Sequence, residues 1–254
     1  MLRTLAVTLT FLLWTGLLLI PVFLSVALTF SGNASAWMAR NLWAPVILWV
    51  AGIRIQIDPP PALDPRQSYV FVCNHQGIYD IPAAIRILPF PLRFVAKSSL
   101  APVPVLGWYL KLAGHVLIDR TNRHRAKRSL DLAARKVAAG VSILIYPEGT
   151  RSPDGTIRPF KKGPFQLALA AQVPIVTVAI EGSQRINGKG SLRTRPGLLR
   201  IRLGEPIPTT GLVQRDREAL MRQVHDRLID SHLAIGGLGG DRAHPIAAAD
   251  GADA

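Results

Sequence analysis

One short segment sets the architecture of the chain: Tyr69-Val70-Phe71-Val72-Cys73-Asn74-His75-Gln76-Gly77-Ile78-Tyr79-Asp80. Its apolar, β-branched first half predicts a short buried strand. Asp80 and Pro82 predict the N-cap and the first turn of the next helix, so His75 and Asp80 share one strand-to-helix loop. A spacing of five turns two side chains about 140° apart on an ideal helix. The pair therefore meets only where the peptide bends, and Gly77 makes such a bend easy.

A histidine beside a carboxylate is suited to removing a proton from a hydroxyl group. Neutral imidazole titrates close to neutral pH, and a carboxylate on its far nitrogen fixes the tautomer and stabilises the imidazolium that forms. His75 and Asp80 are therefore a candidate general base and its partner, in a reaction that needs no nucleophile from the protein. The same spacing also fits a loop histidine followed by a helix-capping aspartate, and the spacing alone leaves both interpretations open.

Three later motifs follow this one in the chain. They are Lys97-Ser98-Ser99-Leu100 with Val103-Pro104, Gly107, Gly114 and Ile118-Asp119-Arg120; Tyr146-Pro147-Glu148-Gly149-Thr150-Arg151-Ser152; and Val173-Pro174-Ile175-Val176. With Asn74 to Asp80 as the first motif, the four resemble the sequence blocks of the glycerolipid acyltransferases, in the same order, between residues 70 and 180. The chain departs from the family in two places, because the family often has serine at position 77 and phenylalanine at position 146.

The resemblance implies a reaction and a set of site residues. The reaction is acyl transfer from acyl-CoA or acyl-carrier protein to the free hydroxyl of a lysophospholipid, with lysophosphatidate as the default acceptor and lyso-ornithine lipid as an alternative. His75 would abstract the hydroxyl proton, and Asp80 would orient His75. The acceptor would be bound by Lys97, Arg120, Glu148, Gly149, Thr150 and Arg151. Neither a cofactor nor a metal is expected, since the acyl carrier is a substrate.

The chemistry of these residue types fits part of that assignment. The guanidinium of Arg151 can grip phosphate oxygens in a bidentate manner, and Gly149 permits a tight turn. Lys97 follows an expected strand and offers a point charge, although a solvated lysine at a strand end is the alternative. Glu148 is harder to place, because a carboxylate repels phosphate. It could bind a glycerol hydroxyl, orient Arg151 or form a simple ion pair in the turn.

A dense run of positive charge follows the second motif. Five basic residues fall within nine positions: Arg120, Arg123, Arg125, Lys127 and Arg128. Such a run is commonly a solvated helix face. It could also attract anionic lipid or the phosphates of an acyl carrier, an effect worth about 1 kcal/mol per basic residue near a charged membrane.

Composition narrows the class of protein. The 254 residues allow one core of ordinary size. The formal charge is +14, the hydrophobic content is 49% and the mean hydropathy is +0.25. A basic and apolar chain favours a membrane surface, whereas nucleic-acid binding would not explain a long apolar N-terminus. The single cysteine excludes an internal disulfide.

The N-terminus predicts a membrane anchor. No charged residue occurs from Thr4 to Ala39, and the apolar run Leu5 to Phe30 exceeds the about 20 residues that cross a bilayer. A second apolar stretch, Leu42 to Ile53, is shorter and predicts an interfacial or re-entrant helix. Four of the five tryptophans lie in this region, as interface residues do. Residues 1–57 would then form an anchoring helical hairpin.

A cleaved signal peptide is the alternative interpretation of this region, because Ala34-Ser35-Ala36 resembles a cleavage site. The apolar run is longer than the about 7 to 15 residues of a signal peptide, which favours the anchor. With the family resemblance, we expect a membrane protein, in a bacterial inner membrane, whose catalytic domain faces the cytoplasm.

The rest of the chain alternates between strand and helix patterns. Expected strands are Tyr69 to Cys73, Leu92 to Ala96, His115 to Ile118, Ser142 to Tyr146, Ile175 to Ile180 and Leu199 to Leu203, the last as a hairpin-like or edge strand. Expected helices are Ala126 to Ala139, Pro164 to Gln172 and Glu218 to Ser231. This alternation predicts an α/β architecture. The resemblance specifies a mixed sheet flanked by helices, as an acyltransferase domain over residues 58–234, and residues 235–254 have the composition of a disordered tail.

Two other hypotheses remain at this point. Cys73 lies two residues before His75, so a cysteine–histidine dyad is conceivable, although a single cysteine is more often a small buried apolar residue. A non-catalytic basic membrane protein that binds anionic lipid or nucleic acid would explain the charge. It would leave the ordered His, Asp, Glu and Arg motifs as coincidence.

Overall fold

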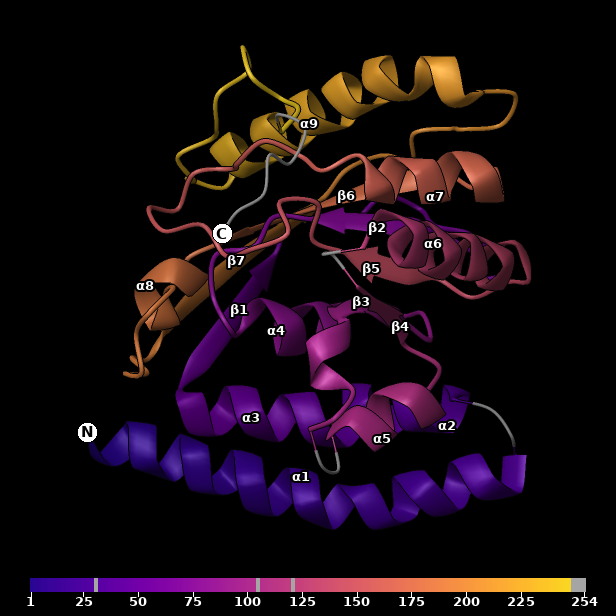
Figure 1. Ribbon diagram of the computed structural model, residues 1–254. Helices are drawn as coiled ribbons and strands as arrows, with labels where there is room; N and C mark the ends of the chain where they lie inside the picture. Colours follow the sequence, from indigo (N-terminus) through magenta and orange to yellow (C-terminus); the bar gives the residue numbers. More distant parts are fainter. Residues whose placement is uncertain (30–31, 104–105, 120–121, 248–254) are drawn as a thin grey trace.

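The structure is a computed structural model that describes residues 1–29, 32–103, 106–119 and 122–247 (Figure 1). The described residues form a seven-stranded sheet in the order β1-β7-β6-β2-β5-β3-β4. The strands are β1 (Ile53–Ile57), β2 (Val70–Cys73), β3 (Arg93–Lys97), β4 (Val116–Ile118), β5 (Ile143–Ile145), β6 (Ile175–Glu181) and β7 (Gly197–Leu203). Neighbouring strands are parallel except for the antiparallel pair of β6 and β7, so the predicted mixed α/β sheet is confirmed.

Strand β1 was not predicted from the sequence. The helix before it ends at Gly52, whose φ of 69° places it in the left-handed region that favours glycine. The chain then pairs in parallel with β7, Ile53 opposite Gly197. The expected boundary between the membrane anchor and the acyltransferase domain, at residue 57, therefore falls at the end of a strand of the sheet. Because β1 lies outside β7, the expectation that Leu199 to Leu203 forms an edge strand is wrong.

The central strand β2 is buried on both faces. Val70 and Val72 face α6 (Arg123–Ala138), α7 (Gly163–Ala171) and α9 (Arg217–Ala234). Phe71 and Cys73 face the opposite layer, which holds α3 (Ala44–Ala51), α4 (Asp80–Ile87) and part of α1 (Leu2–Thr29). The near-continuous apolar run in β2 is what a strand covered on both faces requires. The sheet thus separates two helical layers, which Figure 1 shows above and below it.

The N-terminal helices form a hairpin. Helix α1 is followed by α2 (Asn33–Met38), the π-helical turn η1 (Ala39–Trp43) and α3, which pack back along it. The indole of Trp14 donates to the carbonyl of Leu42 at 3.1 Å, and the indole of Trp43 donates to the hydroxyl of Thr15 at 2.9 Å. Among the described residues, α1 is the one helix long and apolar enough to cross a membrane.

Short elements complete the fold. The turn η2 (Ser98–Leu100) and α5 (Leu106–Leu112) connect β3 to β4, and α8 (Ser183–Asn187) lies between β6 and β7. The turn η3 (Gln214–Asp216) leads into α9. The predicted helices at 126–139, 164–172 and 218–231 correspond to α6, α7 and α9, with ends that shift by a few residues.

The segment after α9 is expected to be disordered, but its residues 235–247 pack against the rest of the protein. The amide of Ile157 donates to the carbonyl of Gly239 at 2.7 Å, and Phe160 donates to Pro245 at 2.8 Å. The side chain of Ile235 is buried in the core. A few well-placed apolar residues and backbone pairs therefore hold this segment, although its average composition is poor in apolar residues. Residues 248–254 lie outside the described residues.

Asn74 fastens the end of β2 to its neighbour β6. Its side-chain amide donates to the carbonyl of Ile180 at 2.8 Å and accepts from the amide of Ile180 at 2.8 Å. The side chain thus continues the strand pairing one residue beyond the last strand residue. It fixes the point where the loop that carries His75 leaves the sheet.

We predict that Asn74→Ala lowers the free energy of unfolding by about 2 to 4 kcal/mol, because both backbone groups of buried Ile180 lose their partner. Denaturant unfolding in detergent measures this loss. Asn122→Ala is the matched control: it removes one hydrogen bond, to the amide of Arg125, at the exposed start of α6. We expect Asn122→Ala to lower the free energy of unfolding by about 1 kcal/mol. Equal losses in the two variants would contradict the assigned role of Asn74.

Candidate active site

The first motif brings His75 and Asp80 together at the carboxyl end of β2. Nδ1 of His75 lies 2.7 Å from Oδ2 of Asp80. The Asp80 side chain is fully buried, whereas that of His75 is 17% exposed. Since a carboxylate accepts, Nδ1 carries the proton and Nε2 carries the lone pair. Nε2 makes no hydrogen bond with the described residues, so it is available as a base.

Asp80 organises the whole loop. Its Oδ2 also accepts from the backbone amides of Gln76 at 2.7 Å and Gly77 at 2.9 Å. The helix-capping interpretation is thus wrong in detail. Tyr79 occupies the N-cap position and Asp80 is the first residue of α4. The carboxylate reaches back across the bend at Gly77 to hold the imidazole.

The third motif packs directly against His75. The ring of Tyr146 stacks on the imidazole, with centroids 4.1 Å apart and planes inclined by 21°. The amide of His75 donates to Oε1 of Glu148 at 2.9 Å, and the amide of Ser152 donates to the carbonyl of His75 at 2.7 Å. These contacts follow from the parallel pairing of β2 with β5, which sends both loops from the same edge of the sheet. The sequence did not predict that Glu148 and Tyr146 contact the histidine.

Burial changes the charge state of Glu148. It raises the pKa of this carboxyl to about 8, although backbone hydrogen bonds from His75 and Arg158 oppose the change; nearby Asp80 adds to it. A large fraction of Glu148 is therefore protonated at neutral pH. Oε1 accepts the His75 amide, which leaves Oε2 to carry the proton. A neutral Glu148 does not repel an anionic ligand, and this resolves the difficulty of placing a carboxylate in a phosphate site.

Arg151 and Lys97 leave the same edge of the sheet as His75. Arg151 precedes Ser152, whose amide binds the His75 carbonyl, and its side chain is partly exposed. Lys97 is the last residue of β3, which pairs in parallel with β5, and its side chain is exposed. Gly149 has a φ of 75° and turns the loop beneath Thr150 and Arg151. The expected contribution of Arg120 lies outside the described residues, as does Pro104 of the second motif.

The fourth motif lies at the amino end of β2 and β6, away from the sheet edge that carries His75, so its part is in the pairing of the strands and not in the site. Its Ile175 begins β6, and the amide of Val70 donates to the carbonyl of Pro174 at 3.1 Å. Just beyond β6, Ser183 crowds Gly77, since a Cβ at position 77 would lie 2.6 Å from the Ser183 carbonyl oxygen. Close packing therefore accounts for glycine at this position.

The cysteine–histidine dyad does not fit the structure. Cys73 is fully buried in the core cluster that faces α3 and α4, and its Sγ contacts the carbonyl of Asn74 at 3.2 Å. Burial raises the pKa of the Cys73 thiol well above its ordinary value, and the negative charges of Asp80 and Glu148 act in the same direction. A thiol in this environment stays protonated and is a poor nucleophile.

The basic run after the second motif lies on α6. Arg125, Lys127 and Arg128 are exposed, and Arg125 forms an ion pair with Asp119 at 3.4 Å. Helix α6 covers the face of the sheet opposite the N-terminal hairpin (Figure 1). The basic residues of α6 and the apolar helix α1 therefore lie on opposite faces of the sheet.

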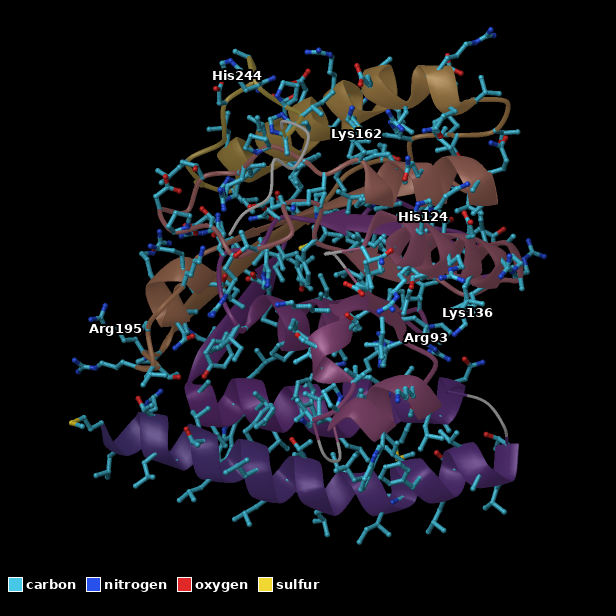
Figure 2. All side chains as sticks on the ribbon, viewed as in Figure 1. Arg93, His124, Lys136, Lys162, Arg195 and His244 are labelled. Carbon is cyan, nitrogen blue, oxygen red and sulfur yellow. The ribbon has the colours of Figure 1, made fainter. Side chains whose placement is uncertain are left out.

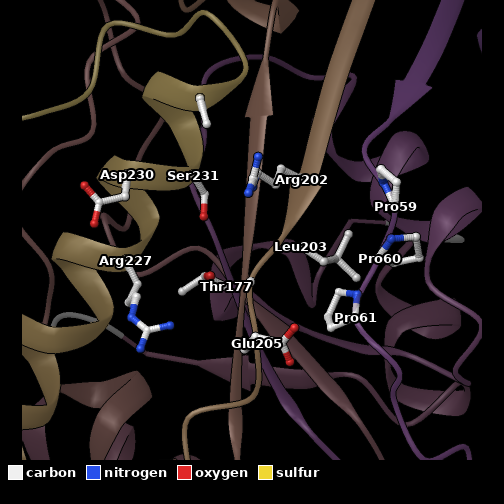
Figure 3. A pocket seen from close by; sticks show the side chains of 12 residues that line it. Pro59, Pro60, Pro61, Thr177, Arg202, Leu203, Glu205, Arg227, Asp230 and Ser231 are labelled. Atoms are coloured by element: carbon white, nitrogen blue, oxygen red, sulfur yellow. The ribbon is translucent and has the colours of Figure 1, made fainter.

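A cavity of about 370 Å³ opens away from the histidine, between α9 and the linker Pro59–Pro61 (Figure 3). Thr177, Arg202, Glu205 and Arg227 are among its lining residues, and none of the four motifs contributes a site residue to it. The candidate site is the loop edge around His75 and not this cavity. Within the described residues, no group of three His, Cys, Asp or Glu side chains could hold a metal ion.

Comparison with known families agrees with this geometry. A family model described as Acyltransferase matches residues 54–181, a range that contains the sheet edge with His75 and Asp80. The chain belongs to this acyltransferase family. It is 30% identical to a 1-acyl-sn-glycerol-3-phosphate acyltransferase of Cocos nucifera, over 90% of the chain and 72% of that protein. Similar matches are the human beta enzyme (36%; 72% of the chain, 66% of that protein) and the Saccharomyces cerevisiae enzyme (31%; 85% and 72%), both 1-acyl-sn-glycerol-3-phosphate acyltransferases.

A solved structure shares the fold. It is the 1-acyl-sn-glycerophosphate acyltransferase from Thermotoga maritima, which superposes with a TM-score of 0.77 over 92% of this chain and 93% of that one. Sequence identity is 24%, so this likeness is evidence for the fold. With the family established, the chain is an acyltransferase, and the hypothesis of a purely binding protein is not retained.

We predict that the stability of the protein depends on the titration of Glu148. Its pKa is raised in the folded state, so its contribution to stability is fully present below about pH 4.5, the unfolded value, and is lost as the pH rises through about 8. The stability of the wild type should therefore fall relative to that of Glu148→Gln as the pH rises through this range. Glu218→Gln, which removes an exposed carboxylate paired with Lys162, should keep the fall. An unchanged pH profile in Glu148→Gln would contradict the assigned charge state.

Proposed function

We propose that this acyltransferase moves an acyl group from acyl-CoA or acyl-carrier protein to the free hydroxyl of lysophosphatidate and so forms phosphatidate. The observation that carries the proposal is the contact of 2.7 Å between Nδ1 of His75 and Oδ2 of Asp80, at an edge that also carries Arg151 and Lys97. The names of the relatives support the choice of acceptor.

His75 acts as the general base. Its Nε2 takes the proton of the acceptor hydroxyl as the oxygen attacks the thioester carbonyl, and Asp80 stabilises the imidazolium that results. The new carbon–oxygen bond gives a tetrahedral intermediate. When the carbon–sulfur bond breaks, the thiolate takes the proton back from His75. The products are the ester and the free thiol of the carrier, and His75 returns to its starting state.

The acceptor phosphate is held by positive charge at the same edge. Arg151 offers a guanidinium fork, and Lys97 offers an ammonium group. Gly149 and Thr150 line the turn that presents Arg151. Glu148 is buried and supports the loop through the His75 amide, and in its neutral form it does not repel the acceptor phosphate. The oxyanion of the intermediate needs donors as well, and amides of these loops are suited to the task.

The donor and the location are part of the proposal. The basic face of α6 lies on the opposite side of the sheet from the hairpin, which suits a phosphate-bearing acyl carrier that approaches from the aqueous side. The apolar helix α1 supports a membrane location, and we place the enzyme in a bacterial inner membrane with the catalytic domain in the cytoplasm.

We predict that His75→Ala abolishes phosphatidate formation and that Asp80→Asn lowers it at least about 100-fold, the usual scale for loss of general-base catalysis. The assay incubates the detergent-purified protein with acyl-CoA or acyl-carrier protein and lysophosphatidate, and mass spectrometry detects the product. Cys73→Ala is the control and should retain activity. Product formation that survives His75→Ala would contradict the mechanism, and turnover of lyso-ornithine lipid alone would contradict the acceptor.

A second prediction concerns Arg151. Arg151→Ala should raise the KM for lysophosphatidate at least about tenfold, because a charge-assisted pair to phosphate is worth more than about 1.4 kcal/mol. Arg158→Ala is the control, since Arg158 is exposed and lies on the same loop. If Arg151→Ala changes the KM for the acyl donor and not for the acceptor, the assignment of Arg151 to the acceptor phosphate is wrong.

A further inference from the structure

Helix α5 exposes an apolar surface that the catalytic mechanism does not use. Leu106 is 40% exposed, Trp108 is 58% exposed and Leu112 is 46% exposed. Leu110 of the same helix is buried, so α5 presents one side to the protein and leaves large apolar residues on the other. Val103, in the turn before it, is 39% exposed as well.

The position of α5 connects this surface to that of α1. Helix α5 contacts α1 and lies in the same layer as the hairpin (Figure 1). Figure 2 shows that the outward side chains of α1 are almost all carbon. They belong to large apolar residues that are more than half exposed: Leu5, Leu12, Leu13, Leu17, Ile20, Leu24 and Leu28. Soluble surfaces rarely carry so many exposed large apolar residues together, and the contact between α1 and α5 makes the two exposed surfaces neighbours.

The residue types on α5 indicate what this surface contacts. Tryptophan is enriched where a protein meets the boundary between lipid and water, and Trp37 and Trp49 of the hairpin are exposed in the same layer. Lys111, also exposed on α5, can extend its charge to the lipid headgroups while its stem stays among apolar residues. This mixture suits an interfacial position better than a protein contact.

The opposite face of the sheet provides a contrast. Leu132 on α6 is 46% exposed, the same value as Leu112. It stands alone among Arg128, Asp131 and Arg135, all of them exposed. A single exposed leucine among charges is ordinary for a soluble surface. The exposed residues of α5 are therefore mainly apolar, whereas those of this part of α6 are mainly charged.

We infer that α5 is a membrane-contacting element whose exposed face, formed by Trp108 and Leu112, rests in the interfacial region of a lipid bilayer, with Leu106 exposed at the start of the helix. Its path starts at the catalytic edge, because β3 ends at Lys97 and η2 leads from there towards α5. Ile78, within the loop that carries His75, is 51% exposed at that edge. Docking of α5 to the bilayer would hold the sheet edge that carries His75 beside the membrane. If the proposed function is correct, a lysophospholipid can then reach His75 without leaving the membrane.

Site-directed labelling tests the contact without reference to activity. The chain has one cysteine, so Cys73→Ala provides a background into which Trp108→Cys or Leu132→Cys is introduced. Each variant is labelled with an environment-sensitive fluorophore and reconstituted into vesicles of phosphatidylcholine and phosphatidylglycerol that contain a lipid-borne quencher. The label at position 108 should report an apolar environment and be quenched, whereas the label at position 132 should remain in water. Equal responses at the two positions would overturn the inference.

A functional measurement tests the consequence for the substrate. Trp108→Glu should reduce turnover of long-chain lysophosphatidate embedded in vesicles at least about tenfold, equivalent to about 1.4 kcal/mol. It should leave turnover of a short-chain, water-soluble lysophosphatidate unchanged, which also shows that the variant is folded. Leu132→Glu should leave both unchanged. Equal turnover of the embedded substrate by Trp108→Glu and Leu132→Glu would contradict the role of α5. A wild-type protein inactive on both substrates would instead refute the proposed function, and the label at position 108 would still decide the membrane contact.

Discussion

One carboxylate oxygen, Oδ2 of Asp80, holds the loop that carries His75 in place. It accepts from the imidazole of His75 and from the amides of Gln76 and Gly77, so a fully buried charge is balanced by three N–H donors. A buried carboxylate is tolerated only with such partners. The same contacts bend the chain between strand and helix and fix the tautomer that leaves Nε2 as a base. The shape of the loop and its chemistry therefore depend on the same atoms.

The parallel pairing of strands in the sheet brings motifs that are distant in sequence to one edge. His75 and the third motif are far apart in the chain, but β2 and β5 are parallel neighbours, so their loops leave one edge and interlock through Glu148, Ser152 and Tyr146. The sheet also divides the molecule into two layers. The layer with α1 and α5 is apolar on its outer surface, and the layer with α6 is basic. The two layers therefore differ in surface chemistry, and His75 lies at the edge of the sheet between them.

Much of this could be predicted from residues that are close in sequence. Short β-branched runs predicted six strands, and the family resemblance, with a spacing and a Gly77 that permit it, predicted the pairing of His75 with Asp80. Other features depend on contacts between distant segments, which local patterns do not encode. The sequence pattern assigns the residues of β1 to the anchor, because the strand that pairs with them, β7, lies far along the chain. The raised pKa of Glu148 depends on burial and on the His75 amide, and the segment after Ile235 is held by backbone groups of Ile157 and Phe160. Neither arrangement has a signature in composition.

In the proposed mechanism, Asp80 holds His75 with its proton on Nδ1 and its lone pair on Nε2. Nitrogen NMR of the protein labelled in its histidine rings tests this most directly, with the His75 signals assigned by their absence in His75→Ala. We expect a protonated Nδ1 and an unprotonated Nε2 at neutral pH. In Asp80→Asn, we expect this single tautomer to be lost. A proton on Nε2 in the wild-type protein, or an unchanged spectrum in Asp80→Asn, would contradict it.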